Sequence, residues 1–232
     1  MERSRIAVSR SALRVARRWL TAALLAGAAF AAYLSAIRPW LLHWGAAVPR
    51  ASFPGDDLVA RPRYVATRGV TIAAPPAAIW PWLVQIGQGR GGFYSYDWLE
   101  NLVGCDIHSA DRILPAFQRL AVGDRVRLEP EGRFDLTVAA VEPERALVLR
   151  TPGNPEENLA ASVPFASWAF ILEPINGRTT RLIARWRADY APSLAGRLAN
   201  HYLLEPIHFI MERKMLLGIK ARAEREMAAS LP

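Results

Sequence analysis

The feature that most constrains this chain is an uncharged, apolar run from Trp19 to Ile37 near its N-terminus. Its nineteen residues extend about 28 Å as a helix, close to the ~30 Å hydrocarbon thickness of a bilayer. Arg17 and Arg18 precede the run and Arg38 follows it, and aromatic residues stand near both ends, as they do at membrane interfaces. The run therefore predicts a transmembrane helix at residues 19–37.

A cleaved secretory signal is the alternative interpretation of this segment. A basic start, an apolar core and small residues such as Ala29 and Ala31 are also what a signal peptidase recognises. The run is longer than the ~7–15 apolar residues of a signal core, which favours an uncleaved anchor.

The arginines on either side of the run predict its orientation. Six arginines lie in residues 1–18, whereas the following flank carries only Arg38 and Arg50. Because positive residues stay on the cytoplasmic side, we expect the N-terminus inside and the remainder of the chain outside the cytoplasm. The expected protein is single-pass, with one extracytoplasmic domain.

The charge of the chain does not indicate a nucleic-acid partner. The net charge is +8, and the first eighteen residues contribute +5 of it. The remaining sequence has no basic stripe interleaved with aromatic residues, so nucleic-acid binding is excluded as a function class. The single cysteine, Cys105, rules out an intramolecular disulfide and a site built from several thiolates. No metal and no cofactor are predicted, and the oligomeric state stays open.

Four segments follow from these patterns. Residues 1–18 form a basic arm, 19–37 the transmembrane helix, 38–66 a linker broken by four prolines, and 67–228 one domain. The domain has a length suited to a single hydrophobic core.

Hydrophobic periodicity predicts the elements of the domain. A strand at 67–73 precedes two short helices at 76–86 and 95–102, and a period of two then marks further strands. These strands are expected at 126–128, 134–140, 146–150, 167–172 and 178–190, and a long helix interrupted by Pro206 is expected at 193–227. In the last strand apolar residues share one face and Arg181, Arg185 and Arg187 share the other, which predicts one packed face and one wet face. The expected class is α+β, with a sheet covered by the long helix.

Two stretches resemble a known superfamily. The residues from Thr71 to Trp80, and the string Gln-Gly-Arg-Gly-Gly-Phe-Tyr-Ser-Tyr at 88–96, are similar to the START/Bet v 1-like superfamily, also called SRPBCC or polyketide cyclase/dehydrase-like. Within it they resemble a bacterial subgroup with an N-terminal membrane segment. The resemblance implies a helix-grip fold with an internal cavity for a hydrophobic ligand. It does not imply a reaction, because members include carriers, receptors and cyclases.

The glycine-rich segment 87–92 has two interpretations. It follows a helix and lacks the Gly-Lys-Ser/Thr ending, so it is not a phosphate-binding loop. It is either a hinge that lets backbones pack closely, or a mobile mouth of the cavity at which Arg90 meets an anionic head group.

Aromatic and polar residues cluster next in the chain, where Tyr94, Tyr96 and Trp98 alternate with Asp97 and Glu100. A pocket for an amphiphile needs apolar walls with a few polar handles. Tyrosine and tryptophan are equally ordinary core residues with a satisfied polar tip, so both interpretations stay open.

On the long helix, His201, Glu205, His208 and Glu212 fall on one face. They lack the His-Glu-x-x-His spacing, which argues against a metal site. We expect Glu212 to pair with an arginine and His208 to be the ligand handle.

The candidate ligand-binding residues are therefore Trp80, Arg90, Tyr94, Tyr96, Trp98, Trp168, Trp186, His201 and His208. The expected function is binding of a hydrophobic or amphipathic small molecule, a lipid or polyketide-like compound, beside the membrane. An enzyme of the cyclase/dehydrase type and a protein-interaction module are the alternatives.

Overall fold

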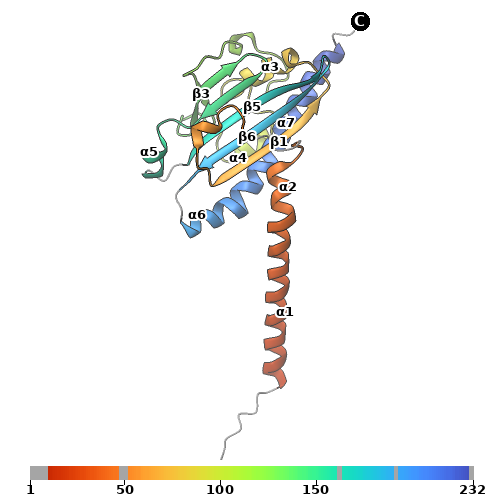
Figure 1. Cartoon of the computed structure of the whole chain (residues 1–232), viewed down its shortest axis with the longest axis vertical. Helices are drawn as coiled ribbons and strands as arrows, with labels where there is room; N and C mark the ends of the chain where they lie inside the picture. The colour runs from red at the N-terminus through yellow and green to blue at the C-terminus, as the bar shows by residue number, and fades with distance from the viewer. Residues whose placement is uncertain (1–9, 47–51, 161–163, 191–192, 230–232) are drawn as a thin grey trace, which may run out of the picture. The chain divides into compact units, whose positions relative to one another are not determined.

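The N-terminal helix extends beyond the apolar run at both ends. In this computed structural model, which describes residues 10–46, 52–160, 164–190 and 193–229, α1 covers Arg10–Ala32, the π-helical turn η1 covers Tyr33–Ile37 and α2 covers Arg38–His43 (Figure 1). The stretch Leu13–His43 is long and apolar enough to cross a membrane, judged by length and composition. The helix thus continues past Ile37 into the segment that the sequence assigns to the linker.

Both π-helical turns of the described chain lie directly before a proline. η1 ends two residues before Pro39, and the second turn, η4 (Asn200–Leu204), ends two residues before Pro206. Proline has no N–H to donate to the preceding turn and its ring collides with a carbonyl there, so an α-helix cannot pass it unchanged. The wider π turn accommodates the ring. Both helices therefore continue through a proline that the sequence pattern marks as an interruption.

The chain divides after Trp40 into two compact units, and the unit from Leu41 onward contains the sheet. Its six antiparallel strands stand in the order β1-β6-β5-β4-β3-β2. Their bounds are β1 Tyr64–Ile72, β2 Arg125–Arg127, β3 Asp135–Glu142, β4 Ala146–Arg150, β5 Phe165–Asn176 and β6 Thr179–Asp189. Each strand expected from the sequence is present. The β5–β6 turn falls at Gly177 and Arg178, one residue later than the expected Asn-Gly turn.

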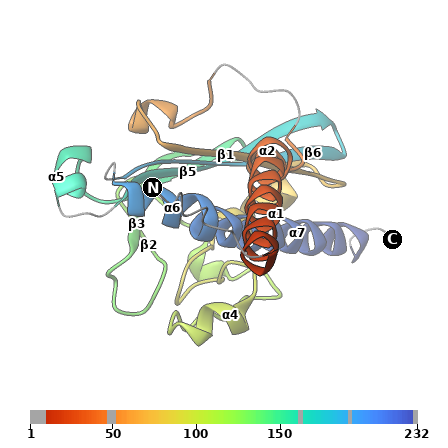
Figure 2. The ribbon, with the colours of Figure 1, turned by 90° about the horizontal axis from the view of Figure 1, so that it is seen from below.

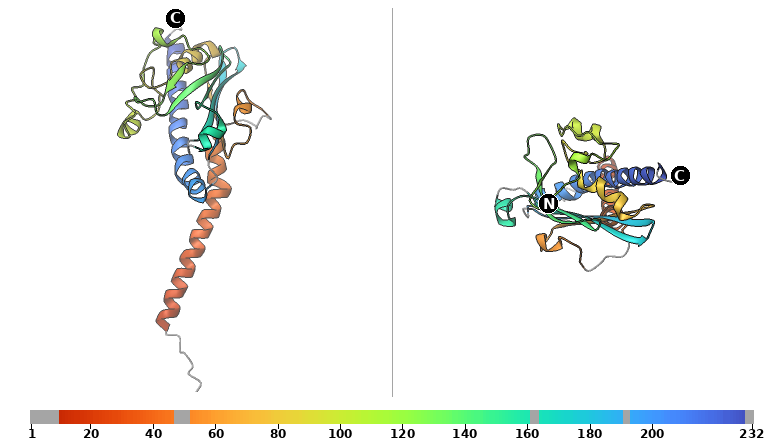
Figure 3. Two further views of the ribbon diagram at one scale, coloured as in Figure 1. Left: turned by 90° about the vertical axis from the view of Figure 1, so that its left-hand side faces the viewer. Right: turned by 90° about the horizontal axis from the view of Figure 1, so that it is seen from above.

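A long C-terminal helix covers one face of this sheet (Figures 2 and 3). It consists of α6 (Leu194–Ala199), η4 and α7 (Glu205–Ala229), and the Ser193 hydroxyl caps it by accepting from the Gly196 N–H at 2.9 Å. The other helical elements are η2 (Asp56–Val59), α3 (Pro76–Val84), α4 (Asp97–Leu102), η3 (Pro115–Phe117) and α5 (Pro155–Ala160). Two short helices, α3 and α4, follow β1 as expected. The α+β helix-grip fold is confirmed.

The main core lies between the sheet and α7. From β6 it takes Leu182 and Ala184, and from α7 it takes Met215 and Ile219. Helix α7 approaches the backbone of Tyr94 closely at Gly218. A Cβ at this position would lie only 2.3 Å from the Tyr94 carbonyl oxygen. The glycine therefore lets α7 pack directly on the backbone that follows α3.

The opposite face of the sheet is covered rather than wet at β6. Phe53, just before η2, packs in a second apolar cluster formed with β4, β5 and β6. Arg185 donates to both carboxylate oxygens of Asp56, at 2.6 and 2.9 Å, and Arg187 donates to the Val59 carbonyl at 2.8 Å. The expectation of a wet face was wrong here, because alternation shows which residues share a face but not which segment covers it.

Candidate functional site

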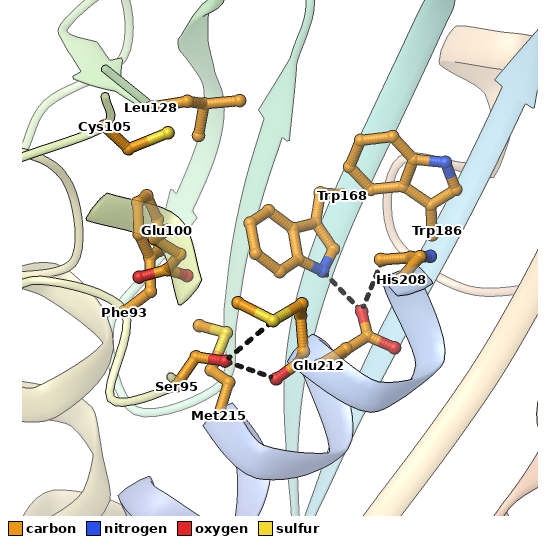
Figure 4. Close-up of a pocket in the computed structure, with 11 residues that line it drawn as sticks. Phe93, Ser95, Glu100, Cys105, Leu128, Trp168, Trp186, His208, Glu212 and Met215 are labelled. Carbon is orange, nitrogen blue, oxygen red and sulfur yellow. Dashed lines mark hydrogen bonds and ion pairs between the residues drawn. The ribbon is translucent and has the colours of Figure 1, made fainter. Parts of the chain in front are cut away.

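A pocket lies between the sheet, α7 and the segment around α4 (Figure 4). Its volume is about 240 Å³. The lining is formed by apolar Phe93, Leu128, Trp168, Trp186, Met211 and Met215, and by polar Ser95, Glu100, Cys105, His208 and Glu212. Figure 4 shows Glu100 and Cys105 at one end and His208 with Glu212 at the other. Apolar walls with a few convergent polar groups are typical of a small-molecule site.

A buried ion pair closes one end of the pocket. Arg68 on β1 donates from Nη1 to Oε2 of Glu212 on α7 at 2.6 Å, and both side chains are fully buried. Trp168 donates from Nε1 to Oε1 of the same carboxylate at 2.8 Å. Burial favours a higher pKa for Glu212, but the charges and hydrogen bonds of His208 and Arg68 outweigh it and lower that pKa to about 2. Glu212 is therefore a carboxylate at neutral pH.

His208 connects this buried pair to the pocket surface. The Tyr64 hydroxyl lies 2.8 Å from Nδ1, and Arg68 Nη2 donates to the same hydroxyl at 3.2 Å. A hydroxyl that accepts from Arg68 can donate its own hydrogen to Nδ1. Nε2 lies 3.4 Å from Oε1 of Glu212. The ring is thus held at Nδ1 by the Tyr64 hydroxyl, whereas Nε2 is buried without a hydrogen-bond partner among the described residues.

Glu100 supplies a different carboxyl group at the other end. Its Oε2 is buried and has no hydrogen-bond partner among the described residues. Burial, and secondly the negative charge of Asp97, raise the pKa of Glu100 to about 7. Near neutral pH this carboxyl is divided between its protonated and charged forms. Burial, followed by the charge of Glu100, also raises the pKa of the Cys105 thiol, which therefore stays protonated.

A second pocket adjoins the first. It measures about 410 Å³ and shares Leu128 and Trp186 with it. Asp135 lines this space with both carboxylate oxygens buried and without hydrogen bonds in the described residues, although Arg125 Nη1 lies 3.7 Å from Oδ2. The two pockets are therefore neighbours on either side of Leu128 and Trp186.

Three of the nine candidate residues line the first pocket, namely Trp168, Trp186 and His208. Trp168 and Trp186 are directly opposed on β5 and β6, with ring centroids 5.7 Å apart. The Trp186 and His208 ring centroids are 4.9 Å apart. These side chains form one continuous aromatic wall.

Arg90 is held by backbone carbonyls and does not line the pocket. It donates to the oxygens of Val84 at 2.8 Å, Ile86 at 3.1 Å and Phe117 at 3.2 Å. A Cβ on neighbouring Gly92, whose φ is +71°, would lie 2.7 Å from the Cα of Ser109. These contacts give the segment the close backbone packing of the first interpretation.

The other aromatic candidates lie away from the pocket. Tyr94 is buried and donates to the Trp82 carbonyl at 3.0 Å. Tyr96 stands at the N-terminus of α4 with Lys214 over its ring at 5.6 Å, and Trp98 is 68% exposed. Trp80 packs against the edge of the main core.

The histidine–glutamate face of the long helix forms ion pairs. Glu212 pairs with an arginine, as expected, and His201 Nδ1 lies 2.7 Å from Oε1 of Glu205. Within the part of the chain that the structure describes, no group of three His, Cys, Asp or Glu side chains is arranged to hold a metal ion.

Several pocket residues were not chosen from the sequence. Met211 and Met215 carry no signal beyond helical spacing, and Arg68 is one arginine among many in an Arg-rich chain. Glu100 stood within the noted aromatic–polar cluster. It differs from its acidic neighbour Asp97, whose carboxylate is bonded to Ser109, by lining the pocket with an oxygen that has no partner among the described residues.

Comparison with solved structures gives similar folds at low identity. The Zhui aromatase/cyclase from Streptomyces sp. R1128 is 15% identical with a TM-score of 0.43, covering 72% of this chain and 98% of its own. Truncated norcoclaurine synthase from Thalictrum flavum is 12% identical with a TM-score of 0.37, covering 73% and 95%. The hypothetical protein jhp0584 from Helicobacter pylori is 12% identical with a TM-score of 0.46, covering 76% and 98%. No family model and no curated protein matches this sequence.

Proposed function

We propose that this protein is a membrane-anchored domain that binds an amphipathic small molecule in the pocket under its C-terminal helix. The observation that supports this most is the pocket itself, whose aromatic and methionine walls end in a few polar groups. The adjoining second pocket extends the apolar space beyond Trp186. A ligand with an elongated apolar body and a small polar head fits this arrangement.

The charges around the first pocket favour a neutral or cationic head group. Its lining contains two carboxyl groups, Glu100 and Glu212, and no lysine or arginine. Arg68, the nearest buried cation, is already paired with Glu212. An anionic head would meet the Glu100 carboxyl, which has no counter-charge and is partly ionised near neutral pH, in a site of low dielectric, which is costly. A hydroxyl or an amine could instead bond to Glu100 Oε2.

A spanning helix would hold this pocket beside the bilayer from which such a ligand partitions. The arginine-rich arm supports an inside N-terminus, and therefore an extracytoplasmic domain. The side of the membrane on which the domain lies can be measured with a single cysteine. Ile175→Cys is introduced into a chain that carries Cys105→Ser, because Ile175 is exposed at the β5–β6 hairpin. A membrane-impermeant maleimide should label it in intact cells, whereas labelling only after lysis would place the domain inside.

Ligand extraction tests the binding proposal. The full chain is purified in mild detergent, extracted with solvent and analysed by mass spectrometry. Met211→Trp adds bulk to the pocket wall and should empty it, whereas Leu102→Trp adds the same bulk at an exposed position of α4. A compound enriched with the wild type and Leu102→Trp but not with Met211→Trp is expected. Equal extracts from all three would contradict binding in this pocket, and a phosphate or carboxylate head would contradict the charge argument.

One observation favours an enzyme as the second candidate. A carboxyl group with a pKa of about 7 in an apolar pocket is poised for proton transfer near neutral pH. If Glu100 acts as acid or base in a cyclisation or dehydration, Glu100→Gln should retain a substrate that the wild type converts. The compound extracted from Glu100→Gln would then differ in mass or retention from that of the wild type. Identical extracts would contradict catalysis by Glu100 and would support ligand binding as the only function.

A further inference from the structure

The C-terminal helix carries an apolar stripe that its own domain does not cover. Six side chains on α6, η4 and the start of α7 are between 45% and 67% exposed, namely Leu194, Leu198, Leu203, Leu204, Ile207 and Ile210. On the same stretch Glu205, Phe209 and Glu212 are buried toward the sheet. The exposed stripe thus lies on the side of the helix that faces away from the core. A contiguous apolar surface of this kind marks an interaction site.

The charges beside the stripe all have one sign. Residues 193–214 contain two acidic side chains, Glu205 and Glu212, and both are buried. The exposed charged residues of this stretch are Arg197, Arg213 and Lys214. An apolar helix face with a basic rim is suited to the interface of a membrane that contains anionic lipids.

The start of the domain lies against the same helix. The Trp44 and Phe209 ring centroids are 6.4 Å apart, and the Arg213 guanidinium lies 4.9 Å from the Trp44 ring centroid. Leu41 is buried, and its carbonyl accepts from Arg68 Nε at 2.6 Å. Helix α7 near residues 209–213 is therefore next to the point where the chain enters the domain.

Chain length then limits how far this region is from the apolar run. Trp44, which contacts α7, comes seven residues after Ile37, the last residue of the run. Seven residues reach at most about 25 Å even when fully extended. If the run spans a bilayer, the part of α7 that contacts Trp44 must lie within about that distance of its surface.

We propose that the stripe formed by Leu194, Leu198, Leu203, Leu204, Ile207 and Ile210 docks into the interface of the membrane that anchors the chain. The inference rests on the proposed anchoring and adds a second membrane contact made by the ligand-binding domain. A second copy of the chain is a poorer occupant, because a two-fold symmetric contact would bring the basic rims of both stripes together. Docking would fix the orientation of the domain and place the long helix of the pocket against lipid.

Fluorescence quenching in nanodiscs tests this. The full chain with Cys105→Ser receives one cysteine at Leu203 or Ile207 in the stripe, at Leu24 in the apolar run, or at Ile175 as an exposed apolar control away from the stripe. Each is labelled with the fluorophore NBD in nanodiscs of phosphatidylcholine and phosphatidylglycerol, with or without lipid carrying a shallow doxyl quencher. The labels at 24, 203 and 207 should lose about half of their emission or more, as interfacial and spanning segments do, while the label at 175 keeps its emission.

The four positions separate the possible failures. Quenching at 24 without quenching at 203 and 207 would overturn docking and leave the anchor intact. No quenching at 24 would overturn the anchor and the docking together. Disulfide cross-linking between two chains at 207 without lipid quenching would assign the stripe to a second copy instead. Replacing phosphatidylglycerol by phosphatidylcholine should weaken quenching at 203 and 207 only, because the basic rim then has no anionic lipid to attract it.

Discussion

Arg68 and Glu212 form an ion pair in which both side chains are fully buried, with 2.6 Å between Nη1 and Oε2. The pair joins β1 to α7, elements at opposite ends of the domain sequence, and it borders the pocket through Glu212. Two charges withdrawn from water are tolerated only when each compensates the other and hydrogen bonds satisfy what remains. Trp168 and Tyr64 supply those further bonds.

Removing one partner should therefore destabilise the domain strongly. Glu212→Gln leaves the Arg68 guanidinium buried without a counter-charge, at an expected cost of about 3–5 kcal/mol. The variant Arg68→Met/Glu212→Leu removes both charges and should recover most of that loss. Unfolding of the full chain in detergent, followed by tryptophan fluorescence, measures both. Glu131→Gln, in an exposed pair with Arg133, is the control and should cost less than about 1 kcal/mol. If Glu212→Gln and Glu131→Gln lost equal amounts of unfolding free energy, burial of the ion pair would not be what makes it important.

The same pair predicts how stability changes in acid. The folded-state pKa of Glu212 is lowered from 4.5 to about 2. Its contribution is therefore present above pH 4.5 and is lost as the pH falls toward 2, because the unfolded chain binds the proton first. The melting temperatures of the wild type and Glu212→Gln should approach each other over that interval. A constant difference from pH 6 to pH 3 would show that the carboxylate charge is not what stabilises the fold.

In Gly218→Ala, helix propensity and tertiary packing act in opposite directions. Within an exposed helix the substitution should stabilise by about 1 kcal/mol. Here the new Cβ would lie 2.3 Å from the Tyr94 carbonyl oxygen, so α7 must move away from the segment that supplies Phe93 and Ser95 to the pocket. We expect a net loss of about 1–3 kcal/mol, as for overpacked cores. Gly177→Ala, where no atom lies within 4 Å, is the matched control and should be nearly neutral.

The strands and the long helix were predictable because burial imposes a period on each of them. Period two also placed Trp186 on the packed face, and helical spacing placed His208 and Glu212 together. Neither pattern contains information about the segment that covers a face, so the contact of residues 52–59 with β6 was not foreseen. The expectation that Pro39 and Pro206 interrupt their helices was wrong for a local reason, because a π turn before each proline lets the helix continue.

Site residues were harder to predict than the fold. Nothing in the sequence of β1 marks Arg68 as the buried arginine, and only the register between β1 and β6 and the packing of α7 bring it to Glu212. Arg90 and Tyr94 belong to the string that carries the family resemblance, yet their polar groups bond to backbone carbonyls. Within this motif the candidates Arg90 and Tyr94 thus serve packing, whereas their neighbours Phe93 and Ser95 line the pocket.

The outer-face pair of Arg185 and Asp56 predicts local rather than global loosening. Both side chains are 13% exposed, and the guanidinium donates two bonds to the carboxylate. Asp56→Asn weakens these charge-assisted bonds, at an expected cost of about 1–2 kcal/mol. Because Phe53 still packs on the sheet, hydrogen exchange should rise in residues 52–59 while β5 stays protected. Uniform loss of protection across the sheet would contradict this.

Glu100 gives the most direct test of the pocket's electrostatics. Its pKa is raised from 4.5 to about 7, so the folded state holds the proton more tightly than the unfolded state. The stability tied to this group is therefore fully present below pH 4.5 and declines as the pH rises toward 7, beyond which it stays constant. Glu100→Gln cannot lose that proton, so its melting temperature should gain on that of the wild type between pH 5 and pH 7 and keep the gain at pH 8. Glu131→Gln, at an exposed position, should show no such trend.

A ligand with a cationic head would stabilise the Glu100 carboxylate, so in its presence the wild-type curve should lose this slope. Parallel curves for the wild type and Glu100→Gln in the empty protein would mean that water reaches the carboxyl and that the pocket is more polar at this end than its lining indicates.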